Sequence, residues 1–245
     1  MGWGDDVEFQ TAKVLKNEEA AADMRAITVQ AGEGILSAFT VPGQFVQIKE
    51  TDDSKAGFYA IASAPGADPS GVCELLIKKS EGNDWSPGNL WLCDAAPGSS
   101  LIMSPAMGNG FKTGESLGGD DVTDVLLFAA GSGISPIRSV IESGVLAAKD
   151  SVTLYYGARC TAAMAYREKF ADWEAAGVTV VPVLSQQAEE WDGRRGYVQG
   201  ALEADGVSAP GATGALMCGM KGMAEAVKEA LVEAGVDEGK VLTNF

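Results

Sequence analysis

Histidine is absent from the 245 residues of this chain, and cysteine is scarce. Without histidine the chain lacks the commonest general base and the commonest metal ligand, which argues against triad hydrolysis and zinc-water chemistry. The cysteines are Cys73, Cys93, Cys160 and Cys218, far apart and without the C-x-x-C pair that holds zinc or an iron-sulfur cluster. We therefore expect no metal site, and unpaired thiols in a reducing compartment.

Basic residues are also few, because 18 lysines and arginines stand against 34 aspartates and glutamates, a net charge of −16. So acidic a surface repels the phosphate backbone of nucleic acids and anionic lipid headgroups. No apolar run approaches the roughly 18 to 20 residues that span a bilayer. We expect neither a nucleic-acid partner nor a membrane span. The acidity either serves solubility or steers a basic partner, and composition does not choose between these two interpretations.

The first half of the chain contains short β-prone segments separated by turn residues, which is typical of an antiparallel barrel or sandwich. The clearest segments are 26–29, 43–48, 57–63, 72–78 and 100–104. The polar, glycine-rich stretch 112–121 follows, and beyond it apolar runs alternate with amphipathic helical patterns, which indicates parallel strands with helical crossovers. We predict a β-barrel domain over residues 1–118 and a parallel-sheet α/β domain over 119–245.

In the second domain the pattern predicts strands over 125–130, 152–156, 178–184 and 215–218, and helices over 136–147, 164–175, 198–203 and 222–234. The first strand runs into Gly131 and Gly133, and Pro136 follows in the first helical turn. Glycines let a backbone approach a pyrophosphate, and the N–H groups at a helix N-terminus attract its charge. A glycine pair alone fits a structural turn equally well, but the strand, turn and helix in sequence favour nucleotide binding.

The turn ends in proline where the usual dinucleotide fingerprint G-x-G-x-x-G has glycine. It resembles the G-x-G-x-x-P turn of the ferredoxin-NADP reductase superfamily. Other segments follow in that family's order: P-G-Q-F-V at 42–46, P-A-M-G-N-G-F at 105–111, Y-G-A-R at 156–159, Y-R-E at 166–168, G-Y-V-Q at 196–199 and C-G-M-K-G-M at 218–223. Each motif alone is weak, but together they make the resemblance specific.

This resemblance implies a flavin-dependent oxidoreductase that moves a hydride from NADPH or NADH to FAD, and electrons on to an acceptor that no residue names. Protein groups in such enzymes orient the cofactors, so a chain without histidine can perform this chemistry. The resemblance implies two catalytic residues, with Cys218 beside the nicotinamide and Phe245 over the flavin ring. Taken alone, Cys218 is more simply a buried thiol at a strand end, and Phe245 fits a frayed terminus equally well.

The resemblance also implies the positions that bind cofactors. For the nicotinamide nucleotide they are Gly131, Gly133, Pro136, Ser185, Arg195, Tyr197 and Gly219, and for the flavin they are Tyr59, Ala60 and Ser86. Ser185, Arg195 and Tyr197 correspond to the residues that read the 2'-phosphate of NADP, although arginines in such a loop are often only solvated charges. Gln186 replaces the arginine of the family's Ser-Arg pair, so we expect only a mild preference for NADPH over NADH.

The flavin motif departs from the family, because R-x-Y-S/T corresponds here to Gly57, Phe58, Tyr59 and Ala60. Glycine cannot replace the bidentate, charge-assisted contact that an arginine makes with the flavin phosphate. Pro87 also removes a backbone donor from the second phosphate-holding segment, 82–89. Two hypotheses stay open: an oxidoreductase that binds FAD weakly, and a reductase-like nucleotide-sensing or structural subunit of a larger assembly without flavin turnover.

The segment 58–63, F-Y-A-I-A-S, is similar to plant and algal plastid members of the family, and this likeness implies a chloroplast location. A redox protein is the expected partner. An acidic ferredoxin is a poor candidate for it, because two strongly negative surfaces repel at long range.

Overall fold

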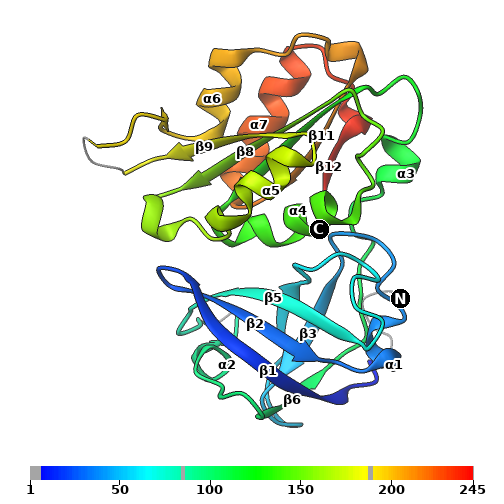
Figure 1. Ribbon diagram of the computed structural model, residues 1–245, viewed down its shortest axis with the longest axis vertical. Coiled ribbons are helices and arrows are strands. Elements are labelled where there is room, and N and C mark those ends of the chain that lie inside the picture. Colours follow the sequence, from blue (N-terminus) through cyan, green and yellow to red (C-terminus); the bar gives the residue numbers. More distant parts are fainter. Residues whose placement is uncertain (1–6, 84–85, 187–189, 245) are drawn as a thin grey trace.

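The computed structural model describes residues 7–83, 86–186 and 190–244. Phe245, the predicted aromatic cover of the flavin ring, lies outside these ranges. Figure 1 shows two bodies, with the barrel strands below and the layered α/β part above. None of the helices within the described ranges is long and apolar enough to cross a membrane.

The N-terminal half is an antiparallel sheet with the strand order β4-β3-β6-β1-β2-β5. Its strands are β1 (Gln10–Ala21), β2 (Met24–Gln30), β3 (Phe45–Lys49), β4 (Gly57–Ala60), β5 (Val72–Lys78) and β6 (Ser100–Met103), with the short helices α1 (Glu33–Leu36) and α2 (Leu90–Cys93) between them. A bridge between Ile61 and Leu75 joins the outer strands, which closes the sheet into a barrel.

Alternation along β5 shows how the sequence builds this barrel. Cys73, Leu75 and Ile77 are buried in the barrel core. The intervening Leu76 packs instead into the core cluster of the second domain, and Glu74 points to the same side as Leu76. One strand therefore serves the barrel with one face and the domain junction with the other.

The C-terminal half is a parallel sheet with the order β10-β9-β8-β7-β11-β12. Its strands are β7 (Asp124–Ala130), β8 (Ser151–Ala158), β9 (Val178–Leu184), β10 (Arg194–Arg195), β11 (Thr213–Cys218) and β12 (Val241–Thr243). The helices are α4 (Ile134–Ser143), α5 (Phe170–Ala175), α6 (Val198–Asp205) and α7 (Lys221–Glu233), and α3 (Thr113–Ser116) precedes the sheet. Helices α4 and α5 cover the face toward the barrel, and α6 and α7 cover the other face (Figure 1).

The predicted fold, an antiparallel barrel followed by a parallel-sheet domain, is confirmed. The last barrel strand ends at Met103 and the first parallel strand begins at Asp124, so the expected boundary at 118 falls between them. The helix predicted over 164–175 is wrong in its first half, because α5 begins only at Phe170 and Tyr166 has a left-handed φ of 61°. The buried Tyr166 hydroxyl donates to Glu74 of the barrel at 2.8 Å, a contact between domains that a local pattern does not contain.

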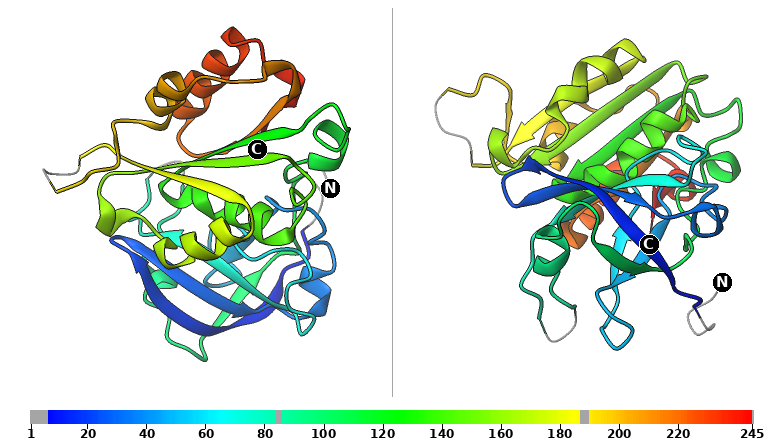
Figure 2. Two further views of the ribbon diagram at one scale, coloured as in Figure 1. Left: turned by 45° about the horizontal axis from the view of Figure 1, so that its top comes forward. Right: turned by 60° about the horizontal axis from the view of Figure 1, so that its bottom comes forward.

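The two domains share one hydrophobic cluster. The barrel contributes Ala21, Met24, Leu76 and Phe111 to the core that α4 and α5 cover. Burying a side chain of the Leu, Met or Phe type contributes about 1.5 to 3 kcal/mol, so this junction is worth several kcal/mol in total. Figure 2 shows the dark blue β1–β2 hairpin extending to the second domain, where the Ala22 amide donates to the Ala162 carbonyl at 2.7 Å.

Candidate functional site

The strand order creates a switch point between β7 and β11. From β7 the chain winds outward through β8 and β9, and it later returns to place β11 on the opposite side of β7. Ligands of open α/β sheets bind at the carboxyl ends of the strands at such a point. Gly131 directly follows β7 and Cys218 ends β11, so the structure brings these two predicted site residues to the same edge of the sheet.

The turn after β7 packs directly on the turn after β11. A Cβ added to Gly133 would overlap the backbone carbonyl of Cys218, and one added to Gly219 would lie 2.9 Å from the Met223 side chain. Gly131 has a φ of +55°, in the left-handed region that side chains disfavour. Glycine is therefore required here by the close packing of the two turns and, at Gly131, by the backbone conformation.

Helix α4 begins directly after this glycine turn. Its N-cap is Gly133, and no side chain caps the first turn, so the N–H groups there have no side-chain partner. Pro136 is the third residue of the helix and is buried, at a position where the missing N–H costs no helical hydrogen bond. The Ile134 amide donates to backbone carbonyls of the preceding turn, and no side chain competes for the other amides of the first turn. These amides and the positive end of the helix dipole suit an anion such as a pyrophosphate, so the residues present fit a nucleotide here.

Cys218 lies at the end of β11, beside this glycine turn. Burial raises the pKa of its thiol to about 12, so the thiol is neutral near pH 7. A neutral, polarizable thiol packs against a ring but does not act as a nucleophile or base. The structure thus gives Cys218 a packing role, and its predicted place beside a nicotinamide stays a prediction.

A second group of predicted residues gathers at the ends of β9 and β10. Ser185 directly follows β9, Arg195 pairs with Leu184 across the two strands, and Tyr197 precedes α6 with 63% of its surface exposed. The Gln186 amide donates to the Arg159 carbonyl at 2.8 Å, so the end of β8 lies beside them.

Arg159 was not among the residues that the sequence singled out. The available signal was its place directly after a buried strand, in the Y-G-A-R motif, where side chains project from the carboxyl edge. It pairs with Asp23 of the β1–β2 hairpin, with 3.4 Å between Nη2 and Oδ2, and both side chains are more than half exposed. Arg159 therefore adds a cation to the group formed by Ser185, Arg195 and Tyr197.

The two groups lie in one row along the sheet edge. β10 and β11 are four strand spacings apart in the sheet order. At about 4.8 Å for each spacing, the ends of the row lie roughly 19 Å apart. The row offers cations at one end, the glycine turn in the middle and a thiol at the other end, which suits an extended dinucleotide with an extra phosphate at the cationic end.

Strand β4 carries the predicted flavin residues, but its surface does not have the arrangement of a phosphate-binding site. A Cβ added to Gly57 would overlap the hydroxyl end of Tyr59, so the Tyr59 ring lies over Gly57 and fills the space that a longer side chain would cross. Burial raises the pKa of Tyr59 to about 12, and the Cys93 thiol adds to the shift while a hydrogen bond from Asn89 opposes it. Tyr59 thus packs against the barrel core in this arrangement.

Arginine is nearly absent from the barrel, since Arg25 is the one arginine among residues 1–118. Arg25 donates through Nε to the Asn17 side chain at 2.8 Å and through Nη2 to the Asn17 carbonyl at 2.6 Å. Strand β4 therefore offers no arginine to the phosphates of a flavin dinucleotide, so a flavin bound there would be held weakly.

The remaining flavin positions are Ser86, in the loop before α2, and Ala60, the last residue of β4. Ser86 is exposed, and its amide donates to the Asn83 side chain at 2.9 Å. Helix α2 begins after Asn89, whose amide group is engaged by the Lys78 carbonyl and the Ser80 N–H. Ser86 is thus separated from the helix start. Ala60 lies at the domain junction, and its flavin role, like that of Ser86, stays a prediction.

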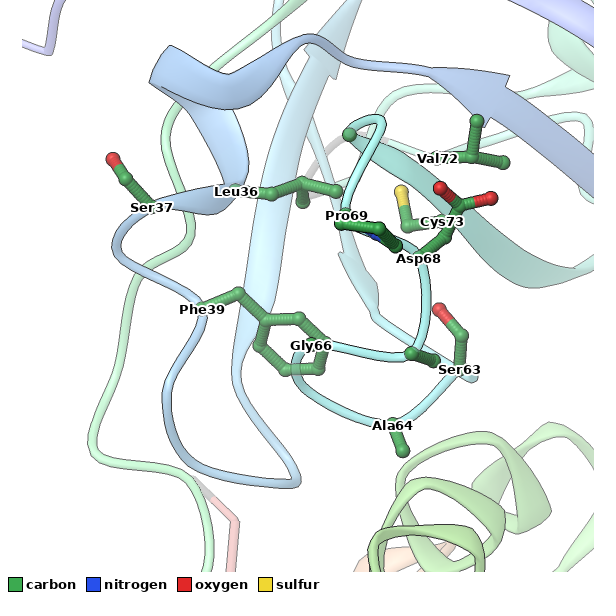
Figure 3. Close-up of a pocket in the computed structure, with 12 residues that line it drawn as sticks. Leu36, Ser37, Phe39, Ser63, Ala64, Gly66, Asp68, Pro69, Val72 and Cys73 are labelled. Carbon is green, nitrogen blue, oxygen red and sulfur yellow. The ribbon is translucent and has the colours of Figure 1, made fainter.

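A cavity of about 240 Å³ opens on the barrel, away from this row. Figure 3 shows it between Leu36 and Phe39 on one side and Pro69 and Cys73 on the other. None of the site residues that the structure describes lines this cavity. Its volume is also below the roughly 300 to 1,000 Å³ of typical small-molecule sites, so we do not assign it to the nucleotide.

Comparison with known proteins supports the nucleotide assignment of the second domain. Residues 127–229 match the family model described as the oxidoreductase NAD-binding domain. The chain is 36% identical over 212 residues to fruit protein pKIWI502 of Actinidia deliciosa, which covers 83% of this chain. It spans 66% of that protein, just under two thirds of its length.

Two further proteins cover both halves of the chain. Ferredoxin–NADP reductase B of Sorangium cellulosum is 28% identical over 217 residues, covering 85% of this chain and 81% of its own length. A crystal structure of a ferredoxin NADP+ reductase from Neisseria gonorrhoeae, with bound FAD and NADP, superposes with a TM-score of 0.81 at 18% identity. That superposition covers 97% of this chain and 98% of the other, and at this identity it shows the shared fold.

Proposed function

Because this chain belongs to the ferredoxin-NADP reductase superfamily, we propose that it is an NAD(P)H-dependent oxidoreductase that passes a hydride to a weakly held flavin. The observation that carries the proposal is the packing of Gly133 on the Cys218 carbonyl, which joins the glycine turn and the thiol in one edge of the sheet. This packing supports the proposal, because a pyrophosphate at the glycine turn and a nicotinamide at the thiol would lie side by side.

The residues of the chain would act by orientation. The α4 amides hold the pyrophosphate, Arg159 and Arg195 attract a 2'-phosphate, and the neutral Cys218 thiol packs against the reacting ring. A flavin, when bound, would supply the hydride-accepting chemistry and would deliver electrons to an external acceptor. The net charge of −16 favours an acceptor that is not itself strongly acidic.

The direct test is anaerobic reduction of added flavin by NADPH, followed through the visible flavin absorbance. We expect FAD to be reduced at a rate that saturates with NADPH, and to be lost from the protein during gel filtration. NADPH binding without any flavin reduction would contradict the proposal.

A second function is favoured by the β4 geometry. The Tyr59 ring over Gly57 and the single barrel arginine, engaged by Asn17, suit a reductase-like subunit that senses a nicotinamide nucleotide without flavin turnover. Nucleotide titration together with the flavin assay separates the two functions, because a sensing subunit would bind NADPH and leave FAD oxidised.

Gly57→Arg tests the flavin site directly. Arginine would add a charge-assisted fork worth about 1.5 to 3 kcal/mol, or roughly tenfold to a hundredfold in flavin affinity, provided that the Tyr59 side chain turns away from Gly57. Gly57→Met is the matched control, since it displaces Tyr59 in the same way without a charge. We expect tighter FAD binding in the arginine variant alone, and equal affinities in both variants would show that β4 does not approach the flavin phosphate.

A further inference from the structure

Helix α4 contacts the barrel through one of its faces. Ser135 donates through its hydroxyl to the Ala60 carbonyl at 3.0 Å, and Ser139 donates to the Ser63 carbonyl at 2.8 Å. Residues three and four apart share a helix face, so Arg138 belongs to this face as well. Arg138 is only 6% exposed, which is unusual for a charged side chain.

The Arg138 guanidinium joins carboxylates from both domains. Its Nη1 pairs with Glu74 of strand β5, and its Nε donates to Glu142 of α4 at 2.9 Å. The guanidinium carbon lies 4.5 Å from the centre of the Tyr166 ring, and the Tyr166 hydroxyl donates to the same Glu74 carboxylate at 2.8 Å. Strand β5, helix α4 and the segment before α5 therefore meet at one cation.

Glu142, on the outer side of this cluster, has further partners. Glu142 accepts from the Trp173 indole at 3.3 Å and pairs with Lys169 at 3.2 Å. Burial alone would favour the neutral form of Arg138, but Tyr166 and the two carboxylates outweigh it, so the pKa of Arg138 is raised. The arginine therefore stays charged, and its planar fork can engage two carboxylates in fixed directions, which the single ammonium of lysine cannot do.

We propose that Arg138 is a positioning residue that fixes the barrel against α4 and so sets where the nicotinamide end of the bound nucleotide meets the barrel. Arg138 follows Gly133 by five residues, which is about 7.5 Å along the helix, so a shift of α4 on the barrel moves the glycine turn with it. The kinetic consequence rests on the proposed function, whereas the contact between the domains does not.

The kinetic test compares Arg138→Met and Arg138→Lys with the wild type. A misplacement of about 1 Å can slow a transfer step by about a hundredfold. We expect flavin reduction at saturating NADPH to slow by about tenfold to a hundredfold in Arg138→Met, with the NADPH dissociation constant changed by less than about twofold. Arg138→Lys should recover part of the rate. Lys228→Met is the control, because Lys228 of α7 makes a surface ion pair with Glu238, in the turn before β12.

A second test needs neither flavin nor nucleotide. Urea unfolding of Glu74→Gln, Arg138→Lys and the double variant measures whether the two side chains act as a pair. We expect the double variant to lower the unfolding midpoint by clearly less than the sum of the single shifts. Glu74→Gln and Arg138→Lys keep hydrogen-bonding groups in place, so they are suited to retain the fold if Arg138→Met does not.

The two tests fail in different ways. Additive midpoint shifts would overturn the contact, and an unchanged transfer rate in Arg138→Met beside a coupled pair would overturn the positioning role. A lower NADPH affinity with a normal transfer rate would also overturn it. If the wild type reduces no flavin, the proposed function and the positioning role fall together, while the urea cycle still decides the contact.

Discussion

At the residue scale, Cys218 illustrates how burial fixes the chemistry open to a side chain. The thiol is neutral because its pKa is about 12, so it cannot serve as a thiolate or as a proton acceptor near pH 7. The role left to this thiol is packing, because its polarizable sulfur lies at the end of β11, beside the glycine turn. A role through contact predicts an effect on the transfer step and little effect on the binding of the phosphates.

We predict that Cys218→Ser slows hydride transfer from NADPH by about tenfold while the NADPH dissociation constant changes by less than about twofold. Single-turnover reduction and equilibrium titration measure the two quantities separately. The wild-type rate should show no step from this thiol between pH 6 and pH 9, because the group stays protonated throughout that window. A large loss of NADPH affinity with a normal transfer rate would rule out this role.

The cations at the β9–β10 end of the row lead to two predictions about nucleotide choice, one of weaker and one of tighter NADPH binding. Arg195→Ala should weaken NADPH binding by roughly tenfold and leave NADH binding unchanged, since a charge-assisted contact to a phosphate is worth about 1.5 to 3 kcal/mol.

Asp23→Asn should tighten NADPH binding by a few fold, because the Asp23 carboxylate lies 3.4 Å from Arg159 and competes with a phosphate for it. Calorimetric titration with both nucleotides checks each variant, and equal losses for NADPH and NADH in Arg195→Ala would contradict the assignment.

At the element scale, the turn between β7 and α4 is where the packing most strictly requires glycine. We predict that Gly133→Ala lowers stability and NADPH affinity together, because the new Cβ would overlap the Cys218 carbonyl and the backbone has to shift. Gly222→Ala in α7 is the matched control: its Cβ meets nothing within 4 Å, and alanine is the better helix former by about 1 kcal/mol. Thermal unfolding with and without NADPH compares the two, and a wild-type-like Gly133→Ala would show that this packing is not required.

The sequence predicted those elements whose signal is local. The strands predicted over 72–78 and 178–184 have the bounds of β5 and β9, because a run of β-branched and aliphatic residues between turn residues is enough to define a buried strand. The two-residue strand β10 and the three-residue strand β12 carry no such pattern. They exist because neighbouring strands already present unpaired edges.

The start of α2 shows the same limit at the candidate site. The family resemblance implied Ser86 as a flavin contact, and that role stays a prediction, while the position of the helix start after Asn89 was not predicted. The loop closes through the Asn89 side chain, which bonds the Ser80 amide and the Lys78 carbonyl. These bonds join residues nine and eleven positions apart, so no local pattern fixes the place where the helix starts.

At the scale of the whole molecule, the contacts at the junction between the domains are the part of the structure that is hardest to predict from the sequence. Arg138 and Glu74 are 64 positions apart, and each alone looks like an ordinary surface charge. The junction combines this ion pair with the shared cluster of Met24, Leu76 and Phe111. Motif order could predict two domains and their folds, whereas the contacts that hold them together depend on the three-dimensional structure.

Buried acidic protons give the whole molecule a predicted sensitivity to alkali. Burial raises the pKa of the Cys73 thiol to about 12, with Glu74 adding to the shift, and burial likewise raises that of Cys218 to about 12. In the unfolded chain both thiols ionise near pH 9. The folded state therefore keeps protons that the unfolded state releases, so stability is fully present below about pH 9 and falls as the pH rises toward 12.

We predict that the free energy of unfolding falls by about 1.4 kcal/mol per pH unit for each of these thiols once the pH is well above 9. Carboxylates do not contribute to this slope, because they are ionised in both states at that pH. Urea unfolding at pH 8, 9, 10 and 10.5 measures the slope. Cys73→Ala should be less stable than the wild type at pH 8, because it leaves a small cavity, yet it should lose stability more slowly above pH 9. Parallel curves for the wild type and this variant would show that the Cys73 thiol does not retain its proton in the folded state.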